Sequence, residues 1–465
     1  MRSNHLSSAR KTWFDGAHHV PLFLFFIKDR LKMQSVTVHP VSSLRGTLTM
    51  PGDKSISHRA IIFSSLAEGE TRIRNLLEGE DVLCTIDCFR EMGVSIEKKG
   101  DEWIVRGVGL GGLQAPKKTL YCGNSGTTTR LLMGLLAAQP FESFLTGDAS
   151  LNRRPMKRVM EPLAKMGASF SLEGEGTEKR IIRVKGAKLQ GISYVSPIAS
   201  AQVKSAILLA GLWAEGETSV AEPSLSRDHT ERILAASGVP FQRKGTRVTI
   251  SAPRRLSLPS LWQVPGDFSS AAFFLVAGAI VPCSQVTLEG VGLNPTRTGA
   301  LEVLKDMRAD IEINHFRMDG GEEVGTLTVS SSLLKAYSME GALIPRLIDE
   351  IPVLAVAGAR AEGTTHIKDA AELRVKESDR IQTLCYLLKK IGVPAQEKED
   401  GLDVEGGHLF RKAEVESFGD HRMAMSMAMA ALVAEGPITI KEVECVNTSF
   451  PTFWECLRKL GVSIK

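Results

Sequence analysis

Stretches that are apolar on every side alternate along the chain with amphipathic stretches. Each apolar stretch has the length of a short helix and follows a polar residue suited to cap a helix. Such helices are predicted to begin after Ser55, Ser125, Ser200, Ser269, Asp349 and Asp420. They recur about every 70 to 80 residues, which is typical of a repeated unit. Because a helix that is apolar all round is stable only inside a core, we expect six core helices.

A second landmark keeps the same period. It is a helix end followed by a strand, at Met92-Gly93-Val94, Met166-Gly167-Ala168, Ser237-Gly238-Val239, Met307-Arg308-Ala309, Ile391-Gly392-Val393 and Leu460-Gly461-Val462. Glycine stands in five of the six copies, at the position after a helix that needs a positive φ. Two landmarks in phase predict six related α/β units. With three core helices per domain and two domains facing each other, six positively polarised helix ends would converge on one cleft and favour anions.

Charge and hydropathy indicate which classes of binding partner are disfavoured for this chain, namely nucleic acids and membranes. The net charge is +4, and residues 1–33 hold six basic and two acidic residues, so the remainder is neutral. A neutral body gives no support for nucleic-acid binding. The apolar run at residues 20–27 is too short to span a bilayer, and no later stretch is a candidate. We therefore expect a cytoplasmic protein that is not bound to a membrane, with residues 1–33 as a disordered or accessory extension.

The seven cysteines are odd in number and scattered, which is typical of a reducing compartment. Cys84 and Cys88 are four residues apart on a predicted helix, but no matching Cys or His pair accompanies them. We expect no metal site.

Charged and polar clusters mark the starts of the predicted helices. The first is Pro51-Gly52-Asp53-Lys54-Ser55-Ile56-Ser57-His58-Arg59, in which a capped helix start lies beside a lysine and an arginine; together they could hold a phosphate or carboxylate. The others are Asn124-Ser125-Gly126-Thr127, Asn152-Arg153-Arg154-Pro155 in a loop, Ser200-Ala201-Gln202-Val203-Lys204, Arg374 to Arg380, and Gly419-Asp420-His421-Arg422.

Each cluster also has a purely structural interpretation. Arg153 could solvate a loop, Lys204 could pair on a surface, and Glu377 with Arg380 could form an ion pair on one helix face. Asp420 could be only a cap, and His421 only a hydrogen-bonded structural residue. The occurrence of the clusters at equivalent points of six repeats favours a shared site.

Together the clusters describe a cleft with many cations, few carboxylates and no nucleophile, phosphate-loop or dinucleotide motif. Asp349 and Glu377 are the best candidates for moving protons. Nearby cations would lower the pKa of either carboxyl group and burial would raise it, so both a base and an acid stay open for each. The residues predict a transferase or lyase that acts on anionic small molecules.

The same motifs resemble the 5-enolpyruvylshikimate-3-phosphate synthase (3-phosphoshikimate 1-carboxyvinyltransferase) family. The resemblance covers about residues 34–465 and includes Arg154-Pro155-Met156, Ile348-Asp349-Glu350 and Asp420-His421-Arg422 in order. It implies an α/β (α+β) fold, a two-domain inside-out α/β barrel in which each domain has three βαβαββ units around buried helices. The implied domains are residues 34–52 plus 265–465 and residues 53–264, with the hinge near residues 51–53 and 264–266.

The resemblance also implies the reaction. The enolpyruvyl group of phosphoenolpyruvate would move to the 5-hydroxyl of shikimate 3-phosphate, through addition and then elimination of phosphate, as a step of aromatic amino acid biosynthesis. Neither a metal nor a cofactor is expected. Closure of the two domains over paired anions would supply the dry, preorganised site that protonation of an enol ether carbon needs.

Site roles follow from the same resemblance. Catalysis would use Asp349 as proton acceptor, Glu377 as the group exchanging a proton with the methylene carbon, and Lys54. Shikimate 3-phosphate would contact Lys54, Ser55, Arg59, Ser200, Ala201, Gln202, Arg227, Asp349 and Lys376. Phosphoenolpyruvate would contact Lys54, Asn124, Gly126, Arg154, Gln202, Arg380 and Arg422.

The chain departs from the family pattern in one place. Many members carry a lysine just before Thr-Phe-Pro, where this chain has Asn447-Thr448-Ser449-Phe450-Pro451, so one contact to phosphoenolpyruvate is lost. The segments Arg227-Asp228-His229-Thr230-Glu231 and Asn294-Pro295-Thr296-Arg297 resemble a subclass that often tolerates glyphosate. Gly126 is nevertheless the residue of sensitive members, so we expect intermediate or real sensitivity.

Three other functions are weighed against this one. A sister enolpyruvyl transferase acting on UDP-N-acetylglucosamine usually has a cysteine in the loop over the donor, which residues 151–155 lack. A nucleic-acid end-binding protein like the RNA 3′-phosphate cyclases is disfavoured by the neutral charge. A non-catalytic anion sensor is the third. We expect a monomer.

Overall fold

The computed structural model describes residues 34–174 and 180–465, so the expectation for residues 1–33 lies outside the described residues. Three sheets of the described chain each come from one continuous unit, with strands paired in the order first, second, fourth, third. They are β6 (Leu120–Tyr121), β7 (Glu142–Thr146), β9 (Ile181–Lys185) and β8 (Ser169–Glu173); β10 (Ser193–Val195), β11 (Glu217–Ala221), β13 (Arg247–Ser251) and β12 (Phe241–Lys244); and β18 (Ser338–Met339), β19 (Thr364–Ile367), β21 (Leu402–Glu405) and β20 (Ala395–Glu397).

Two further sheets have the same order but exchange their first strands. β2 (Arg45–Thr49) pairs in parallel with β15 (Gln285–Gly292), and β14 (Leu261–Gln263) pairs in parallel with β3 (Glu68–Arg74). The chain crosses at these exchanges, where Gly52 and Gly266 form an isolated bridge. The remaining strands of the two sheets are β4 (Ser95–Lys99), β5 (Glu102–Val108), β16 (Asp310–Asp319) and β17 (Glu322–Ser330).

The last sheet joins the two ends of the described chain. It contains β22 (Ala413–Glu416), β23 (Ile438–Lys441) and β1 (Ser35–Val38), and Val38 forms a bridge with Ile464. With this sheet the described residues form six small sheets, five of four strands and one of three, in line with the six units that the sequence period predicts.

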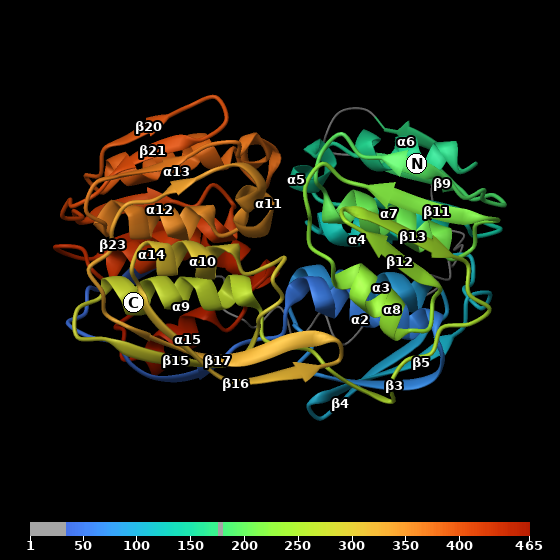
Figure 1. Ribbon diagram of the computed structural model, residues 1–465, viewed down its shortest axis with the longest axis horizontal. Helices are drawn as coiled ribbons and strands as arrows, with labels where there is room; N and C mark the ends of the chain where they lie inside the picture. Colours follow the sequence, from blue (N-terminus) through green and yellow to red (C-terminus); the bar gives the residue numbers. More distant parts are fainter. Residues whose placement is uncertain (1–33, 175–179) are drawn as a thin grey trace, which may run out of the picture. The chain divides into compact units, whose positions relative to one another are not determined.

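The core helices fall into two groups of three. α2 (Lys54–Leu66), α4 (Gly126–Leu136) and α7 (Ala201–Gly211) form the first group, at the right of Figure 1. α9 (Phe268–Ile280), α12 (Ile351–Arg360) and α14 (His421–Ala431) form the second, at the left. Nearly every residue of these helices is buried, which confirms the expected core helices. Contacts join α4 to α7, and α12 to both α9 and α14.

The other helices are amphipathic and carry both buried and exposed positions. They are α3 (Glu80–Glu91), α6 (Lys157–Lys165), α8 (His229–Ala236), α10 (Gly299–Asp306), α13 (Arg380–Lys390) and α15 (Phe453–Lys459). Each is followed by a residue with positive φ, and in α10 that residue is Arg308 at 71°. The second landmark is therefore confirmed even in the copy that lacks glycine. Short elements complete the chain: α5 (Ala149–Arg153), α11 (Ile344–Leu347), and 3-10 turns at Gly341–Leu343, Ala371–Val375 and Val443–Thr448.

Three predicted helix starts are wrong by one or two residues. Asp53 caps α2 in place of Ser55, Asp267 caps α9 in place of Ser269, and Glu350 precedes α12 in place of Asp349. At α2 and α9 the aspartate carboxylate accepts a backbone N–H of the first turn, and a carboxylate is favoured at the positive helix end. Ser125, Ser200 and Asp420 cap as predicted. The described part of the chain contains no helix with the length and apolar character needed to cross a bilayer.

Candidate functional site

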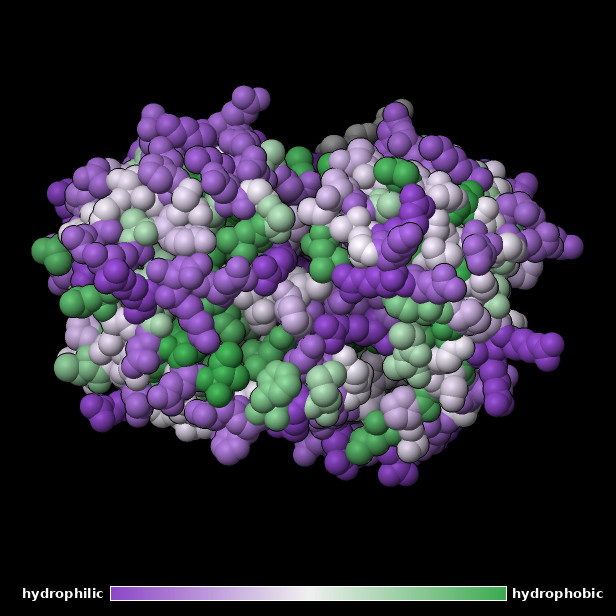
Figure 2. All heavy atoms as spheres, in the orientation of Figure 1, coloured by the Kyte–Doolittle hydropathy of each residue, from purple (hydrophilic) through white to green (hydrophobic). Residues whose placement is uncertain are grey.

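A cavity of about 570 Å³ lies among the N-terminal ends of the core helices of both groups. On the face drawn in Figure 2, hydrophilic and hydrophobic residues are interspersed along the middle of the molecule. Nearly all predicted site residues line the cavity, namely Lys54, Ser55, Arg59, Gly126, Arg154, Ser200, Ala201, Gln202, Arg227, Asp349, Lys376, Glu377, Arg380 and Arg422. Asn124 is the predicted residue that does not. The structure thus brings together residues from distant parts of the sequence.

The start of α2 supplies two of the cations. Lys54 Nζ lies 3.1 Å from Asp81 Oδ2 on α3. Arg59, one turn further along α2, donates to Thr230 and Ser205 and to the carbonyl oxygen of Ser55. Burial lowers the pKa of Arg59 to about 10, so its guanidinium is still charged at neutral pH.

A second set of cations lines the cavity beside the start of α4. Arg154 contacts Glu377 at 3.5 Å and donates to Asn124 Oδ1, so Asn124 holds Arg154 from behind the cavity surface. Arg154 is not in a simple loop as predicted, because it ends the short helix α5. A Cβ added at Gly126 would lie 3.0 Å from Arg130 Nη1 and 3.3 Å from Arg154 Nη1, so a side chain there would crowd both cations.

Sequence reasoning missed Arg130 and Arg158 in the same set. Arg130 donates to Gln202, which in turn donates to Thr127 at 3.0 Å. Burial, followed by the charges of Arg158 and Arg154, lowers the pKa of Arg130 to about 9. Mutual repulsion among three guanidinium groups is relieved when an anion enters. The signal was available, since Arg130 lies four residues after Gly126 and therefore on the same face of α4.

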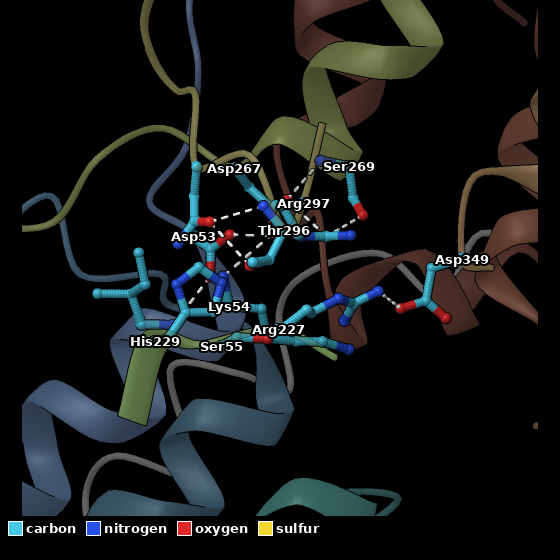
Figure 3. A network of polar contacts seen from close by, with 12 residues as sticks. Asp53, Lys54, Ser55, Arg227, His229, Asp267, Ser269, Thr296, Arg297 and Asp349 are labelled. Atoms are coloured by element: carbon cyan, nitrogen blue, oxygen red, sulfur yellow. Dashed lines mark hydrogen bonds and ion pairs between the residues drawn. The ribbon is translucent and has the colours of Figure 1, made fainter. Parts of the chain in front are cut away.

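Asp349 is the carboxylate that meets the most cations. Arg227 donates to it from the first group (Figure 3), and Lys376 and Arg380 lie 3.5 and 3.4 Å away. Arg422 Nη1 donates to the Asp349 carbonyl oxygen at 2.7 Å. Burial alone would raise the pKa of Asp349, but Lys376, Arg227, Arg422 and Arg380 hold it well below its usual range. Asp349 is therefore ionised and able to accept a proton.

Glu377 is the second carboxylate in the cavity. It lies before α13 and not on a helix, so the predicted helical spacing with Arg380 is wrong, because Asp379 caps the helix at that point. The ion pair itself exists, with Arg380 Nη2 2.7 Å from Glu377 Oε2. Burial opposes ionisation of Glu377, but Arg380, Arg154 and further cations hold its pKa well below its usual range.

A buried network that the sequence did not reveal supports the second group of helix starts. Arg297 contacts Glu350 at 3.0 Å and Asp267 at 3.4 Å, and it donates to Ser269 (Figure 3). Arg380 likewise contacts Asp420 at 2.7 Å. The carboxylates that cap or precede α9, α12 and α14 are therefore neutralised by arginines from within.

Two other residues differ from their simplest interpretation. Lys204 does not pair on a surface: its side chain is 1% exposed and contacts two buried glutamates. His421 lines the cavity, and burial, with the charge of Lys54 next, lowers its pKa to about 3. His421 is therefore neutral at physiological pH.

Metal-ligating residues do not cluster in the described chain. Within residues 34–174 and 180–465, no group of three or more His, Cys, Asp or Glu side chains is arranged to hold a metal ion. Burial raises the pKa of Cys84 to about 12, and no cysteine is among the residues lining the cavity.

Known proteins resemble this chain over almost all of its described length. The family model for EPSP synthase (3-phosphoshikimate 1-carboxyvinyltransferase) matches residues 38–457. A 3-phosphoshikimate 1-carboxyvinyltransferase of Bacillus cereus is 51% identical over 430 residues, covering 92% of this chain and all of the relative. One of Desulforamulus reducens is 52% identical over 428 residues, covering 92% and 99%. A solved EPSP synthase of Acinetobacter baumannii has a TM-score of 0.82 at 49% identity, covering 93% and 99%.

Proposed function

The chain belongs to the EPSP synthase family, and from this premise we propose how its residues share the work of the reaction. The chain transfers the enolpyruvyl group of phosphoenolpyruvate to shikimate 3-phosphate in the shikimate pathway, giving 5-enolpyruvylshikimate 3-phosphate and phosphate. One observation carries the assignment of roles: two ionised carboxylates, Asp349 and Glu377, meet cations from both groups of helices in a single cavity.

Shikimate 3-phosphate binds, in this proposal, to the side of the cavity formed by α2, α7 and the loop before α8. Lys54, Ser55, Arg59, Ser200, Ala201, Gln202, Arg227 and Lys376 hold it. Arg227 and Lys376 both contact Asp349 now. A bound phosphate that draws these cations away would release the Asp349 carboxylate to approach the 5-hydroxyl.

Phosphoenolpyruvate binds in the proposal beside the start of α4. Lys54, Gly126, Arg154, Gln202, Arg380 and Arg422 hold it, and Asn124 acts through its hydrogen bond to Arg154. Arg154 and Arg380 flank Glu377, so the donor and the second carboxylate would share the same cations. Glu377 would then lie near the methylene carbon.

The two carboxylates then divide the proton transfers. Asp349 accepts the hydroxyl proton as the oxygen attacks the donor, and the methylene carbon takes a proton from Glu377. In the elimination step the new methyl group returns a proton to Glu377, the C–O bond to phosphate breaks, and the departing phosphate takes up the proton held by Asp349. Lys54 stabilises the negative charge that builds on the departing phosphate.

Glu377 must be protonated to act first as an acid, although cations hold its pKa low in the empty cavity. The phosphate and carboxylate of the donor would neutralise Arg154, Lys54 and Arg380. That neutralisation removes the field that lowers the pKa of Glu377, while its burial continues to raise the pKa. Binding of the anionic substrate would therefore load the proton that the reaction consumes.

We further propose that the domains are residues 34–52 plus 265–465 and residues 53–264, and that they close around the substrates. The exchange of β2 and β14 between sheets supports a boundary at residues 51–53 and 264–266. Neither glycine at the crossing has room for a side chain: a Cβ at Gly52 would lie 1.8 Å from the Asn75 carbonyl oxygen. The crossing is thus a narrow pair of backbone segments.

A monomer in the cytoplasm is also proposed. Hydrophobic residues on the face in Figure 2 occur in small clusters among hydrophilic ones, whereas stable oligomers usually bury larger apolar areas. All seven cysteines are free thiols, as expected in a reducing compartment.

The test is a phosphate-release assay with purified protein. Phosphoenolpyruvate plus shikimate 3-phosphate should give phosphate and the enolpyruvyl product without added metal. Phosphoenolpyruvate plus UDP-N-acetylglucosamine should give none. Release with the nucleotide sugar, or none with shikimate 3-phosphate, would contradict the proposal.

A further inference from the structure

Lys204 lies on α7, one turn after the helix start, with its ammonium group in the interior. Its Nζ lies 2.7 Å from both Glu222 and Glu231, and the three side chains are between 1% and 2% exposed. A buried ammonium is stable only when it is paired. The two glutamates therefore contribute similarly to stabilising the buried charge of Lys204.

Glu222 makes additional contacts that Glu231 lacks. Its Oε1 accepts the backbone N–H of Ser200 at 2.8 Å, and its carboxylate accepts the hydroxyl of Ser226 at 2.7 Å. Among the described residues, no hydrogen bond of the Glu231 carboxylate reaches either serine. Lys204 Nζ itself donates to the Ser226 carbonyl oxygen at 3.4 Å.

These two serines belong to separate segments of the cavity wall. Ser200 caps α7 and precedes Ala201 and Gln202, and Ser226 precedes Arg227. Glu222 is not among the lining residues, so it acts from behind the wall. Its backbone follows β11 and is fixed by hydrogen bonds in both directions with Thr246. The carboxylate is therefore a rigid point to which both segments are tied.

We infer that Glu222 is a positioning residue for the acceptor side of the site, with Lys204 holding its carboxylate in place. This inference rests on the proposed roles of Ser200 and Arg227 in holding shikimate 3-phosphate. Because Glu222 fixes the distance between these two segments, its loss displaces the groups that hold the acceptor. The donor contacts on α4 are anchored elsewhere and keep their geometry.

The matched pair Glu222→Met and Glu231→Met tests the inference. Both substitutions remove one carboxylate from Lys204 and keep the side-chain length, so both should lower thermal stability, Glu222→Met the more because it also loses the hydrogen bonds to Ser200 and Ser226. Glu222→Met should raise the KM for shikimate 3-phosphate at least about tenfold, as expected for displaced binding groups. The KM for phosphoenolpyruvate should change less than about threefold, and Glu231→Met should change both constants less than about threefold.

Two further variants provide a fallback for a protein that does not fold and a reference for direct binding. If Glu222→Met does not fold, Glu222→Asp retains the charge for Lys204 but is too short to reach both serines, and it should raise the same KM. Arg227→Ala is the reference for direct binding. An unchanged KM for shikimate 3-phosphate in Arg227→Ala overturns the proposed binding role and this inference with it. A raised KM in Arg227→Ala with an unchanged one in the Glu222 variants, or with an equal rise in Glu231→Met, overturns this inference alone.

Discussion

The two groups of core helices start with different chemistry although their folds are alike. In the first group, α2, α4 and α7 are capped by Asp53, Ser125 and Ser200. In the second, the residues before α9, α12 and α14 are Asp267, Glu350 and Asp420. Two of the three caps of the first group are therefore neutral, and all three residues of the second group are acidic.

The neighbouring arginines differ accordingly. In the second group, Arg297 and Arg380 neutralise the capping carboxylates from within. Beside the first group, Arg154 and Arg227 extend away from its helices. They reach Glu377 and Asp349, which lie beside the second group. The positive helix ends of the first group are thus available to bind external anions. Those of the second group are already occupied by carboxylates of the protein. In the proposed function, anion binding therefore belongs mainly to the first group and proton transfer to the second.

The largest effect on activity is expected from a substitution of Glu377, beside the second group. Glu377→Gln keeps the shape of the side chain but removes its ability to exchange a proton, so kcat should fall by about 10² to 10⁴-fold. The KM for shikimate 3-phosphate should change only slightly. Steady-state phosphate release checks both constants, and a kcat within a few-fold of the wild type would rule out this role.

A smaller effect is expected at Arg154 in the first group. Arg154→Ala removes a charge-assisted contact to the donor, so the KM for phosphoenolpyruvate should rise by about 10- to 100-fold, with a lesser fall in kcat. The control is Arg153→Ala, because Arg153 is exposed and does not line the cavity. Equal effects of the two substitutions would show that general charge, and not the site, attracts the donor.

Both groups contain a buried neutral histidine, His58 on α2 and His421 on α14. Burial, with the charge of Lys54 next, lowers the pKa of each. Below pH about 6.5 the unfolded chain binds these protons and the folded chain does not, so stability falls with falling pH by about 1.4 kcal/mol per pH unit for each histidine. Urea unfolding of His58→Gln between pH about 7 and 5 should show a shallower loss than the wild type. Identical slopes would contradict the neutral state.

The smallest effect is expected at Gly126. A Cβ there would lie 3.0 Å from Arg130 Nη1 and 3.3 Å from Arg154 Nη1, and both are ends of flexible side chains. Gly126→Ala should therefore raise the KM for phosphoenolpyruvate by about tenfold or less and weaken inhibition by glyphosate. The KM for shikimate 3-phosphate serves as the internal control, and an equal rise in it would indicate general damage to the cavity.

Much of this comparison could be predicted from the sequence, because the helix starts and ends recur with one period. Arg308 adopts a positive φ at the position where the other five copies have glycine, so the repeated backbone conformation is kept without that residue. The exact caps could not be predicted, since a carboxylate at Asp53 or Asp267 competes with a nearby serine. The pairing of β2 with β15 and of β14 with β3 could not be predicted from the strand sequences themselves, because a strand sequence does not specify its partner. Only the domain boundaries implied by the family resemblance pointed to it.

The supporting residues of the site were the hardest to predict. Lys204 looks like a surface cation in the sequence, and Arg297 appears only within a subclass motif. Only tertiary packing brings them to Glu222 and Glu350. Arg130 was missed although its helical spacing from Gly126 was visible. Residues that face the cavity carry a motif, whereas residues that hold them in place depend on distant contacts.

The most direct test of the account is turnover by Asp349→Ala at saturating concentrations of both substrates, with shikimate 3-phosphate binding measured by calorimetry on the same protein. We predict that kcat falls by at least about 10²-fold while the acceptor still binds with an affinity close to that of the wild type. Near-normal turnover, or a loss of binding that accounts for the whole loss of activity, would contradict the division of labour between the two groups.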